Sequence, residues 1–183
     1  MASDETTGTT QTTTEAAATA ATAATTARHG AGIDRTEEWA QLRARHLRAA
    51  GARSLCVHAG GDVRVLGERA PGLPWRIGVQ HPRERDRVAA VLHAPPDGLA
   101  VATSGAYERG AHIVDPRTGQ APEGVLSVTV LGPDLGTADA YATAAFAMGV
   151  HGPAWTAGLG DYEALTILSD GRVLSTRGVP DVE

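Results

Sequence analysis

The chain has 183 residues, of which 42% are hydrophobic and 20% charged, and its formal net charge at pH 7 is −5. This length and composition predict one folded domain. The negative charge argues against nucleic-acid binding, which needs a basic surface to neutralise phosphates. No apolar run approaches the roughly 18 to 20 residues of a membrane-spanning helix. We therefore expect neither a nucleic acid nor a membrane as a partner.

Two residue types are scarce enough to exclude whole classes of chemistry. All 16 basic residues are arginines, so a Walker-type phosphate loop, a lysine Schiff base and a lysine general base are excluded. The single cysteine, Cys56, excludes an intramolecular disulfide and a cysteine-based zinc site. We expect Cys56 to be a small buried residue, and any metal to be held by oxygen or imidazole ligands.

The N-terminal segment differs in composition from the rest of the chain. Residues 1–28 are almost entirely Thr, Ala and other small or polar residues, which cannot bury enough apolar surface to offset the entropy of ordering. We predict a disordered tail over 1–28 and a folded domain over 29–183. Because the tail opens with acidic residues rather than a basic start and an apolar stretch, no export signal is predicted and a cytoplasmic location is expected.

The first predicted element is a helix over residues 35–50, between a capping pattern that starts at Asp34 and the terminating Gly51. One side of this segment is apolar. The other side is interpreted as a solvated face. That face carries three arginines, Arg43, Arg45 and Arg48.

After the helix, short apolar segments bounded by Gly and Pro turns predict a series of strands. An Ala-rich segment, 137–148, predicts a second helix that is capped by Thr137 and ended by Gly149. The sequence therefore predicts an α+β fold with a mostly antiparallel sheet and a helix near each end. The predicted strands are 54–58, 62–66, 75–80, 88–93, 99–103, 112–114 and 126–131, followed by a hairpin of 163–168 and 173–175, and the rings expected in the core are Trp39, Trp75 and Phe146.

Three clusters have residue types suited to chemistry. The first is Gly60-Gly61-Asp62, where glycine allows a ligand to approach the backbone closely; the alternative is an ordinary two-glycine hairpin with a solvent-facing Asp. The second runs from Ser104-Gly105 through His112 to the turn 115–119. A histidine beside a turn rich in backbone donors suits a general base near a phosphate. The alternative is a strand histidine that pairs with a neighbouring carbonyl.

The third cluster is Asp139 and Thr143, which lie four residues apart and therefore on one face of the predicted second helix. A carboxylate and a hydroxyl at this spacing can both reach one hard cation. Magnesium suits them because it prefers oxygen ligands and is commonly held by few carboxylates together with substrate phosphates. Helix capping is the alternative, since Asp is also favoured near a helix N-terminus and Thr can bond back to the preceding turn.

In their order along the chain, six segments resemble the FAD:protein FMN transferases of the ApbE family. The resemblance covers the chain from about residue 30 to its end. The most specific part is the His-to-Gly turn followed by Thr-Ala-Asp and Ala-Thr-Ala. The segments are Gly60-Gly61-Asp62-Val63, Trp75-Arg76-Ile77-Gly78, Ala102-Thr103-Ser104-Gly105, His112-Ile113-Val114-Asp115-Pro116-Arg117-Thr118-Gly119, Ser127-Val128-Thr129-Val130 and Thr137-Ala138-Asp139-Ala140-Tyr141-Ala142-Thr143-Ala144.

The resemblance implies an enzyme that binds FAD and Mg²⁺ and transfers FMN to a Thr or Ser hydroxyl of a flavin-acceptor protein, with release of AMP. By that analogy Asp139 and Thr143 are the metal ligands, and His112 is the catalytic base. Phosphoryl transfer of this kind depends on charge neutralisation and positioning. The residues expected to bind the flavin cofactor are His29, Gly60, Gly61, Asp62, Ser104, Gly105, Thr118 and Gly119.

Part of the family pattern is altered or has no counterpart here. In the family, a glycine preceded by Lys or Glu contacts FAD and the metal just before the first matched helix, whereas this chain has His29-Gly30. The FAD-binding half that precedes this region in the family is not matched, so a separate chain or a second copy is an expected partner that completes the site. Two alternatives to the transferase are an FAD diphosphate hydrolase and a non-catalytic flavin-binding or regulatory module.

Overall fold

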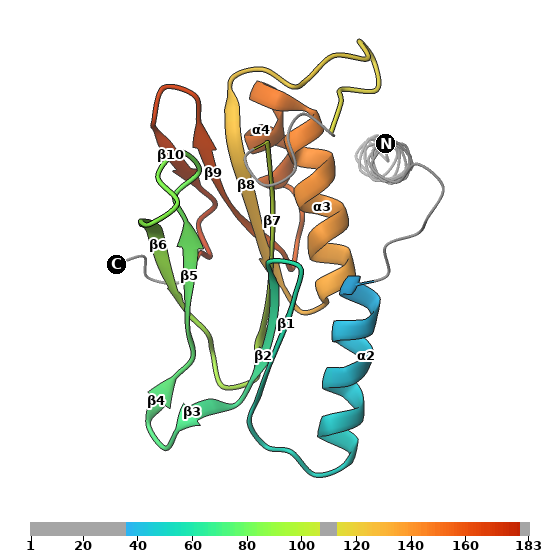
Figure 1. Cartoon of the computed structure of the whole chain (residues 1–183), viewed down its shortest axis with the longest axis vertical. Helices are drawn as coiled ribbons and strands as arrows, with labels where there is room; N and C mark the ends of the chain where they lie inside the picture. Colours follow the sequence, from blue (N-terminus) through green and yellow to red (C-terminus); the bar gives the residue numbers. More distant parts are fainter. Residues whose placement is uncertain (1–35, 107–112, 180–183) are drawn as a thin grey trace, which may run out of the picture.

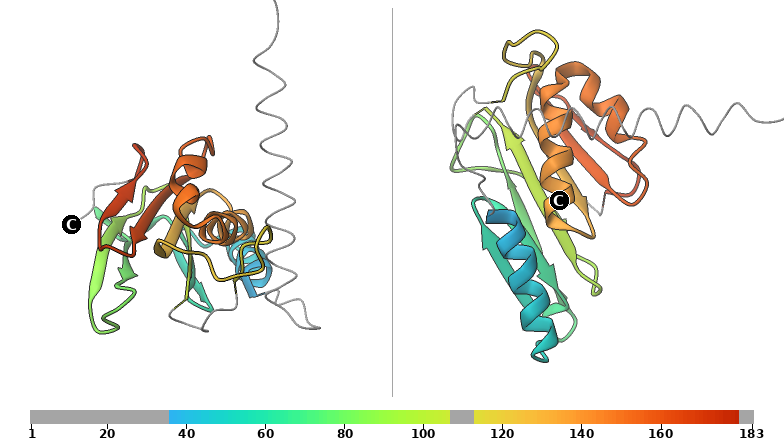
Figure 2. Two further views of the ribbon diagram at one scale, coloured as in Figure 1. Left: turned by 90° about the horizontal axis from the view of Figure 1, so that it is seen from above. Right: turned by 90° about the vertical axis from the view of Figure 1, so that its right-hand side faces the viewer.

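The structure is a computed structural model that describes residues 36–106 and 113–179. A six-stranded antiparallel sheet forms its middle layer, with helices on one face and a separate β-hairpin on the other (Figures 1 and 2). The sheet has the strand order β1-β2-β7-β8-β9-β10. Its strands are β1 (Leu55–Ala59), β2 (Asp62–Leu66), β7 (Leu99–Gly105), β8 (Val125–Gly132), β9 (Glu163–Leu168) and β10 (Val173–Ser175).

The remaining elements cover this sheet. Helices α2 (Thr36–Ala49), α3 (Leu135–Ala147) and α4 (Gly152–Thr156) lie on one face, and a short 3-10 turn (Gly149–His151) joins the last two. On the other face, β5 (Arg76–Gln80) and β6 (Val88–His93) pair as a hairpin. The strands β3 (Glu68–Ala70) and β4 (Leu73–Pro74) form a small ribbon that leads into it. The predicted α+β class with a mostly antiparallel sheet is thus confirmed.

Each face of the sheet has its own apolar core, because side chains alternate along a strand. On the helix side, Val128 and Val130 of β8 pack with Leu135 and Phe146 of α3. On the hairpin side, Leu131 of β8 belongs to a second cluster. Other buried members of that second cluster are Val65, Ile77, Val79, Leu92, Val101, Leu165 and Ile167.

Helix α3 begins earlier than the sequence predicts. Its N-cap is Asp134, whose Oδ1 accepts hydrogen bonds from the backbone N of Thr137 at 3.0 Å and from its Oγ1 at 3.1 Å. Thr137 is therefore the third residue of the helix and not its cap. The sequence contains both a carboxylate and a hydroxyl at suitable positions, and the carboxylate takes the cap because Leu135 can then be buried completely.

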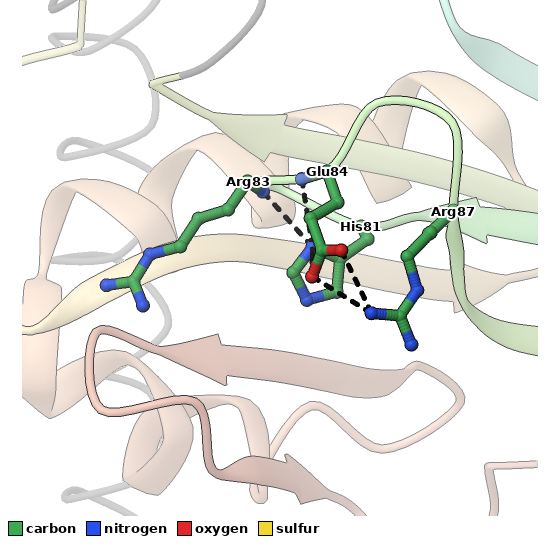
Figure 3. A network of polar contacts seen from close by, with 4 residues as sticks. All are labelled: His81, Arg83, Glu84 and Arg87. Atoms are coloured by element: carbon green, nitrogen blue, oxygen red, sulfur yellow. Dashed lines mark hydrogen bonds and ion pairs between the residues drawn. The ribbon is translucent and has the colours of Figure 1, made fainter.

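The loop between β5 and β6 is held by its own side chains and by a contact to the far hairpin (Figure 3). His81 Nδ1 accepts from the backbone N of Arg83 at 3.3 Å and of Glu84 at 3.0 Å. The Glu84 carboxylate accepts two contacts from Arg87 Nη1, at 2.9 and 3.1 Å. The Arg83 side chain points away from these three residues, and its Nη2 donates to the carbonyl of Ser169 at 2.6 Å.

Several local predictions were wrong. Residues Ile113 and Val114 are not in a strand, although Ile113 is 2% exposed and packs in the helix-side core. Cys56 is exposed, because it alternates with Leu55 and Val57, which point toward the helices. Helix α4 and the β3–β4 ribbon were not predicted. Among the described residues, no helix is long and apolar enough to cross a membrane.

The three predicted core rings have different positions. Phe146 is 2% exposed in the helix-side core. Trp75 is partly buried beside the hairpin-side cluster, where its Nε1 donates to the carbonyl of Leu66 at 3.2 Å. The Trp39 side chain lies outside the part of the chain whose side chains are described. The prediction therefore holds for two of the rings.

Candidate functional site

Asp62, the first residue of β2, connects this strand to β7 through its side chain. Strand β2 starts after a turn in which Gly60 and Gly61 have φ of 59° and 105°, a region that glycine adopts without strain. The Asp62 side chain is 5% exposed, and its Oδ1 accepts from the backbone N of Thr103 at 3.1 Å. Pairing between β2 and β7 reaches only to Val63 and Val101. Beyond that pair, the Asp62 carboxylate supplies the acceptor for the backbone N of Thr103. Asp62 is therefore buried and not solvent-facing.

The next residue of β7, Ser104, contacts helix α3. Its Oγ lies 3.1 Å from Thr143 Oγ1, and the two side chains are 3% and 0% exposed. Strand alternation directs Ser104 toward α3 and Thr103 toward the hairpin side, where Thr103 Oγ1 lies 2.9 Å from Thr129 Oγ1. The sheet thus carries a pair of hydroxyl groups on each face at the same end of β7.

Asp139 extends the Ser104–Thr143 pair along α3. It precedes Thr143 by four residues, which places it on the same helix face at about 6 Å along the axis. Asp139 is partly buried, in the second turn of the helix. We call Ser104, Asp139 and Thr143 the α3 oxygen cluster. The oxygen atoms that it offers as metal ligands belong to one carboxylate and two hydroxyls. This set fits Mg²⁺, with substrate phosphates as further ligands.

A cleft lies on the face of the sheet opposite the α3 oxygen cluster. Gly60 and Gly61 line this cleft of about 430 Å³ together with His58, Gln80 and Thr103. The apolar part of its lining comes from the hairpin-side core. The glycines that the sequence associates with FAD therefore face this cleft, whereas the α3 oxygen cluster lies under the helix. The structure separates them by the thickness of the sheet.

The turn 115–119 is organised by its own first residue. The carbonyl of Asp115 accepts from the backbone N of Thr118 at 3.2 Å and of Gly119 at 2.8 Å. Its carboxylate accepts from the backbone N of Arg117 and from the guanidinium, at 2.9 to 3.1 Å. These bonds to Arg117 are the main reason that the pKa of Asp115 is lowered. Gly119 has a φ of 70°, which glycine permits.

The remaining predicted site residues are only partly described. Gly105 is buried at the end of β7, opposite Ser127 of β8. His112 and His29 lie outside the described residues, so the structure says nothing of their positions. The described residues contain no group of three or more His, Cys, Asp and Glu side chains arranged for a metal. The α3 oxygen cluster is thus the part of the predicted site that the structure brings together.

Two relevant features were missed in the sequence. The first is Asp134, which caps α3 and so determines where the helix that carries Asp139 and Thr143 begins. A Pro-Asp pair before an apolar run is an N-cap signal, so Pro133-Asp134 contained the information. The second is the contact between Ser104 and Thr143. Residues 39 positions apart are brought together only by packing, and no local pattern predicts that distance.

Solved structures share this fold. The flavinyl transferase ApbE from Pseudomonas stutzeri, in its apo form, matches 78% of this chain and 49% of its own, with 31% identity and a TM-score of 0.66. The ApbE protein from Thermotoga maritima matches 76% and 48%, with 34% identity and a TM-score of 0.63. The fold is therefore the α+β fold found in the flavin transferases.

Sequence comparison gives the family. The model of the ApbE family matches residues 38–166, and the chain belongs to this family. The FAD:protein FMN transferase of Rhodobacter capsulatus is 40% identical over 139 residues, which are 71% of this chain and 26% of that protein. That of Vibrio cholerae is 37% identical over 113 residues, 57% of this chain and 34% of that protein. The chain thus matches only about a quarter to a third of these two relatives.

Proposed function

We propose that this chain acts as an FAD:protein FMN transferase. In the reaction, a Thr or Ser hydroxyl of an acceptor protein attacks the phosphorus of the FMN half of FAD. A new oxygen–phosphorus bond forms, the bond to the bridging oxygen of the diphosphate breaks, and AMP leaves with that oxygen. The hydroxyl proton passes to a base, for which the proposal retains His112.

The α3 oxygen cluster is the observation that carries this proposal. Burying Ser104 and Thr143 under an Ala-rich helix costs free energy unless their hydroxyls are paired, and the two lie 3.1 Å apart. Asp139 adds a partly buried carboxylate one turn away. Polar groups held this firmly in an otherwise apolar layer suit a site whose ligands must keep their positions.

The residues of the cluster have distinct roles in the proposal. Asp139 and Thr143 hold Mg²⁺, which neutralises charge on the diphosphate when it is bound. Ser104 fixes the Thr143 hydroxyl from the strand side, and Gly105 leaves room beside it. The turn that contains Thr118 and Gly119 contacts the diphosphate, with Asp115 and Arg117 setting its shape. The proposal keeps Gly60, Gly61 and Asp62 as flavin-contacting residues at the edge of the cleft on the other face, so FAD would have to reach around the end of the sheet from the metal to this turn.

Calorimetry with FAD, in the presence and absence of Mg²⁺, tests the site. The full chain is compared with Asp139→Ala and with Asp170→Asn, a control that removes one carboxylate from the exposed β9–β10 turn, where Asp170 pairs with Arg172. We expect magnesium-dependent FAD binding that Asp139→Ala abolishes and Asp170→Asn leaves unchanged. Absence of FAD binding to the unaltered chain would contradict a stand-alone transferase and favour a non-catalytic module or a site completed by another chain.

Incubation with FAD and a flavin-acceptor protein then distinguishes transfer from hydrolysis. Covalent yellow acceptor with equimolar AMP supports the transferase. FMN and AMP released without labelled acceptor identify an FAD diphosphate hydrolase instead. For His112→Asn we expect retained FAD binding and a rate reduced by about 10²-fold or more, because the hydroxyl proton loses its acceptor.

A further inference from the structure

A small pocket away from the α3 oxygen cluster lies between α2 and the first two strands. Its volume is about 190 Å³. The buried apolar part of its lining is formed by Ala44, Leu55 and Leu66, which make up the core between α2 and β1–β2. The polar part consists of Gln41, Arg45, Arg48 and Arg64. Two elements of the fold, α2 and β2, therefore contribute three arginines to the lining of one small pocket.

Among the described side chains, the arginines of this pocket outnumber the carboxylates near them. Arg45 Nη2 lies 3.7 Å from Asp134 Oδ2, and the other carboxylate oxygen of Asp134 is occupied as the cap of α3. Arg64 is half-buried, and its Nη1 donates to the carbonyl of Val65 at 2.7 Å. Burial lowers the pKa of Arg64, the charge of Arg48 lowers it further, and Asp134 and Asp97 oppose the shift. Among the residues whose side chains are described, three arginines thus have two carboxylates, Asp134 and Asp97, near them.

Gln41 supplies an independent observation. Its Oε1 atom is buried and has no hydrogen-bond partner among the described residues. A buried amide oxygen without a partner costs free energy, so an occupant able to pair with it stabilises the pocket. A carboxylate or sulfate at neutral pH cannot donate to that oxygen. A hydrogen phosphate can, because it carries a proton on one oxygen and negative charge on the others.

We propose that this pocket binds a small phosphate, with Arg45, Arg48 and Arg64 donating to its oxygens and the Gln41 amide pairing with the oxygen that carries the proton. Guanidinium groups match phosphate geometry and form charge-assisted hydrogen bonds. The volume admits inorganic phosphate or a small phosphomonoester and is too small to enclose a dinucleotide. The site is separate from the α3 oxygen cluster and does not depend on the transferase proposal.

Titration of the full chain with inorganic phosphate at constant ionic strength, followed by NMR, tests the site. We expect saturable shifts of the Gln41 side-chain amide and of the Arg64 Nε–H signal. Arg48→Gln is expected to weaken binding about tenfold, since a hydrogen bond to a charged group is lost. The matched control is Arg43→Gln, which removes an exposed arginine of the same helix that does not line the pocket, and it should leave the affinity unchanged.

Sulfate and a phosphomonoester complete the experiment. Sulfate has the shape of phosphate and no proton at neutral pH, so we expect it to bind more weakly, and Gln41→Leu should remove that preference. Glycerol 3-phosphate is largely the dianion at neutral pH and then has no proton on its phosphate, so we expect it too to bind more weakly than inorganic phosphate. Equal binding would show that Gln41 does not pair with a protonated phosphate oxygen and would overturn that part of the proposal. Equal losses in Arg48→Gln and Arg43→Gln, or shifts that do not saturate, would overturn the proposal and show non-specific attraction by the basic helix.

Discussion

Helices α2 and α3 lie on the same face of the sheet but differ in how much of their surface is buried against it. Helix α3 buries eight of its 13 residues, and two of the chemically interesting side chains, Asp139 and Thr143, are held within that packing. In the part of α2 whose side chains are described, only Ala40 and Ala44 are buried. Its arginines are exposed, and two of them, Arg45 and Arg48, line the small pocket beside β2. The comparison shows two ways to place polar groups: by packing under a helix, or by convergence of long side chains at a helix edge.

Removing one large side chain from each helix should give the largest contrast. Leu135 is completely buried at the start of α3, whereas Leu47 of α2 is 46% exposed. We expect Leu135→Ala to lower the free energy of unfolding by about 2 to 5 kcal/mol, because it leaves a cavity. Leu47→Ala should cost under about 1 kcal/mol, since much of that side chain remains in water. Urea denaturation measures both, and equal losses would contradict the comparison.

The N-cap of α3 should give the next largest effect. Asp134→Ala removes the acceptor for two hydrogen bonds from Thr137 and is expected to cost about 1 kcal/mol of unfolding free energy. Asp134→Asn is the matched control, because asparagine caps helices as well as aspartate but carries no charge. A large loss in the asparagine variant would show that the ion pair with Arg45, and not the cap, is the important contact.

The two hydroxyl pairs at the end of β7 allow a sharper comparison of the two sheet faces. A double-mutant cycle with Ser104→Ala and Thr143→Val should give a coupling of about 1 kcal/mol, as should Thr103→Val with Thr129→Val. Thr143→Val is expected to weaken magnesium-dependent FAD binding, and so is Ser104→Ala because Thr143 loses its partner, whereas Thr129→Val is not. If Thr129→Val weakens that binding equally, the metal site does not belong to the helix side alone.

The smallest expected effect concerns the exposed turn 115–119. Hydrogen bonds from Arg117 hold the pKa of Asp115 below its ordinary value, so Arg117→Gln should raise it toward that value. A lowered carboxyl pKa stabilises the fold at pH values above that of the unfolded carboxyl, about 3.9, and this stabilisation is lost as the pH falls through the folded pKa. An NMR titration of the Asp115 carboxyl measures the change. An unshifted titration would show that the pair does not persist in solution.

Much of the fold could be predicted because its signals are local. The hairpin turns and the strands 62–66, 88–93, 163–168 and 173–175 have the predicted bounds. Errors arose where two local signals predict different structures, or where a residue type is found both buried and exposed. Gly152-Pro153 indicates a break in a helix, yet proline near a helix start is favoured, and α4 begins there. Cys56 was assigned by residue type, although its position in the strand decides its exposure.

The candidate site was predictable only in part, for a different reason. The spacing of Asp139 and Thr143 places them on one helix face in any packing arrangement. The contact of Thr143 with Ser104 depends on how α3 lies across β7, which is determined by the cores on both sides of the sheet. The same holds for Arg64, which joins Arg45 and Arg48 only because α2 packs on β2. Such contacts depend on tertiary structure.

The bond between Arg83 and the carbonyl of Ser169 has a consequence for the order of folding. It joins two hairpins that are 86 residues apart in the sequence. Closing so large a loop costs conformational entropy, so this contact is expected to form after the local hairpins have formed. During synthesis, the loop of the β5–β6 hairpin can therefore form this bond only after the turn between β9 and β10, which contains Ser169, has left the ribosome.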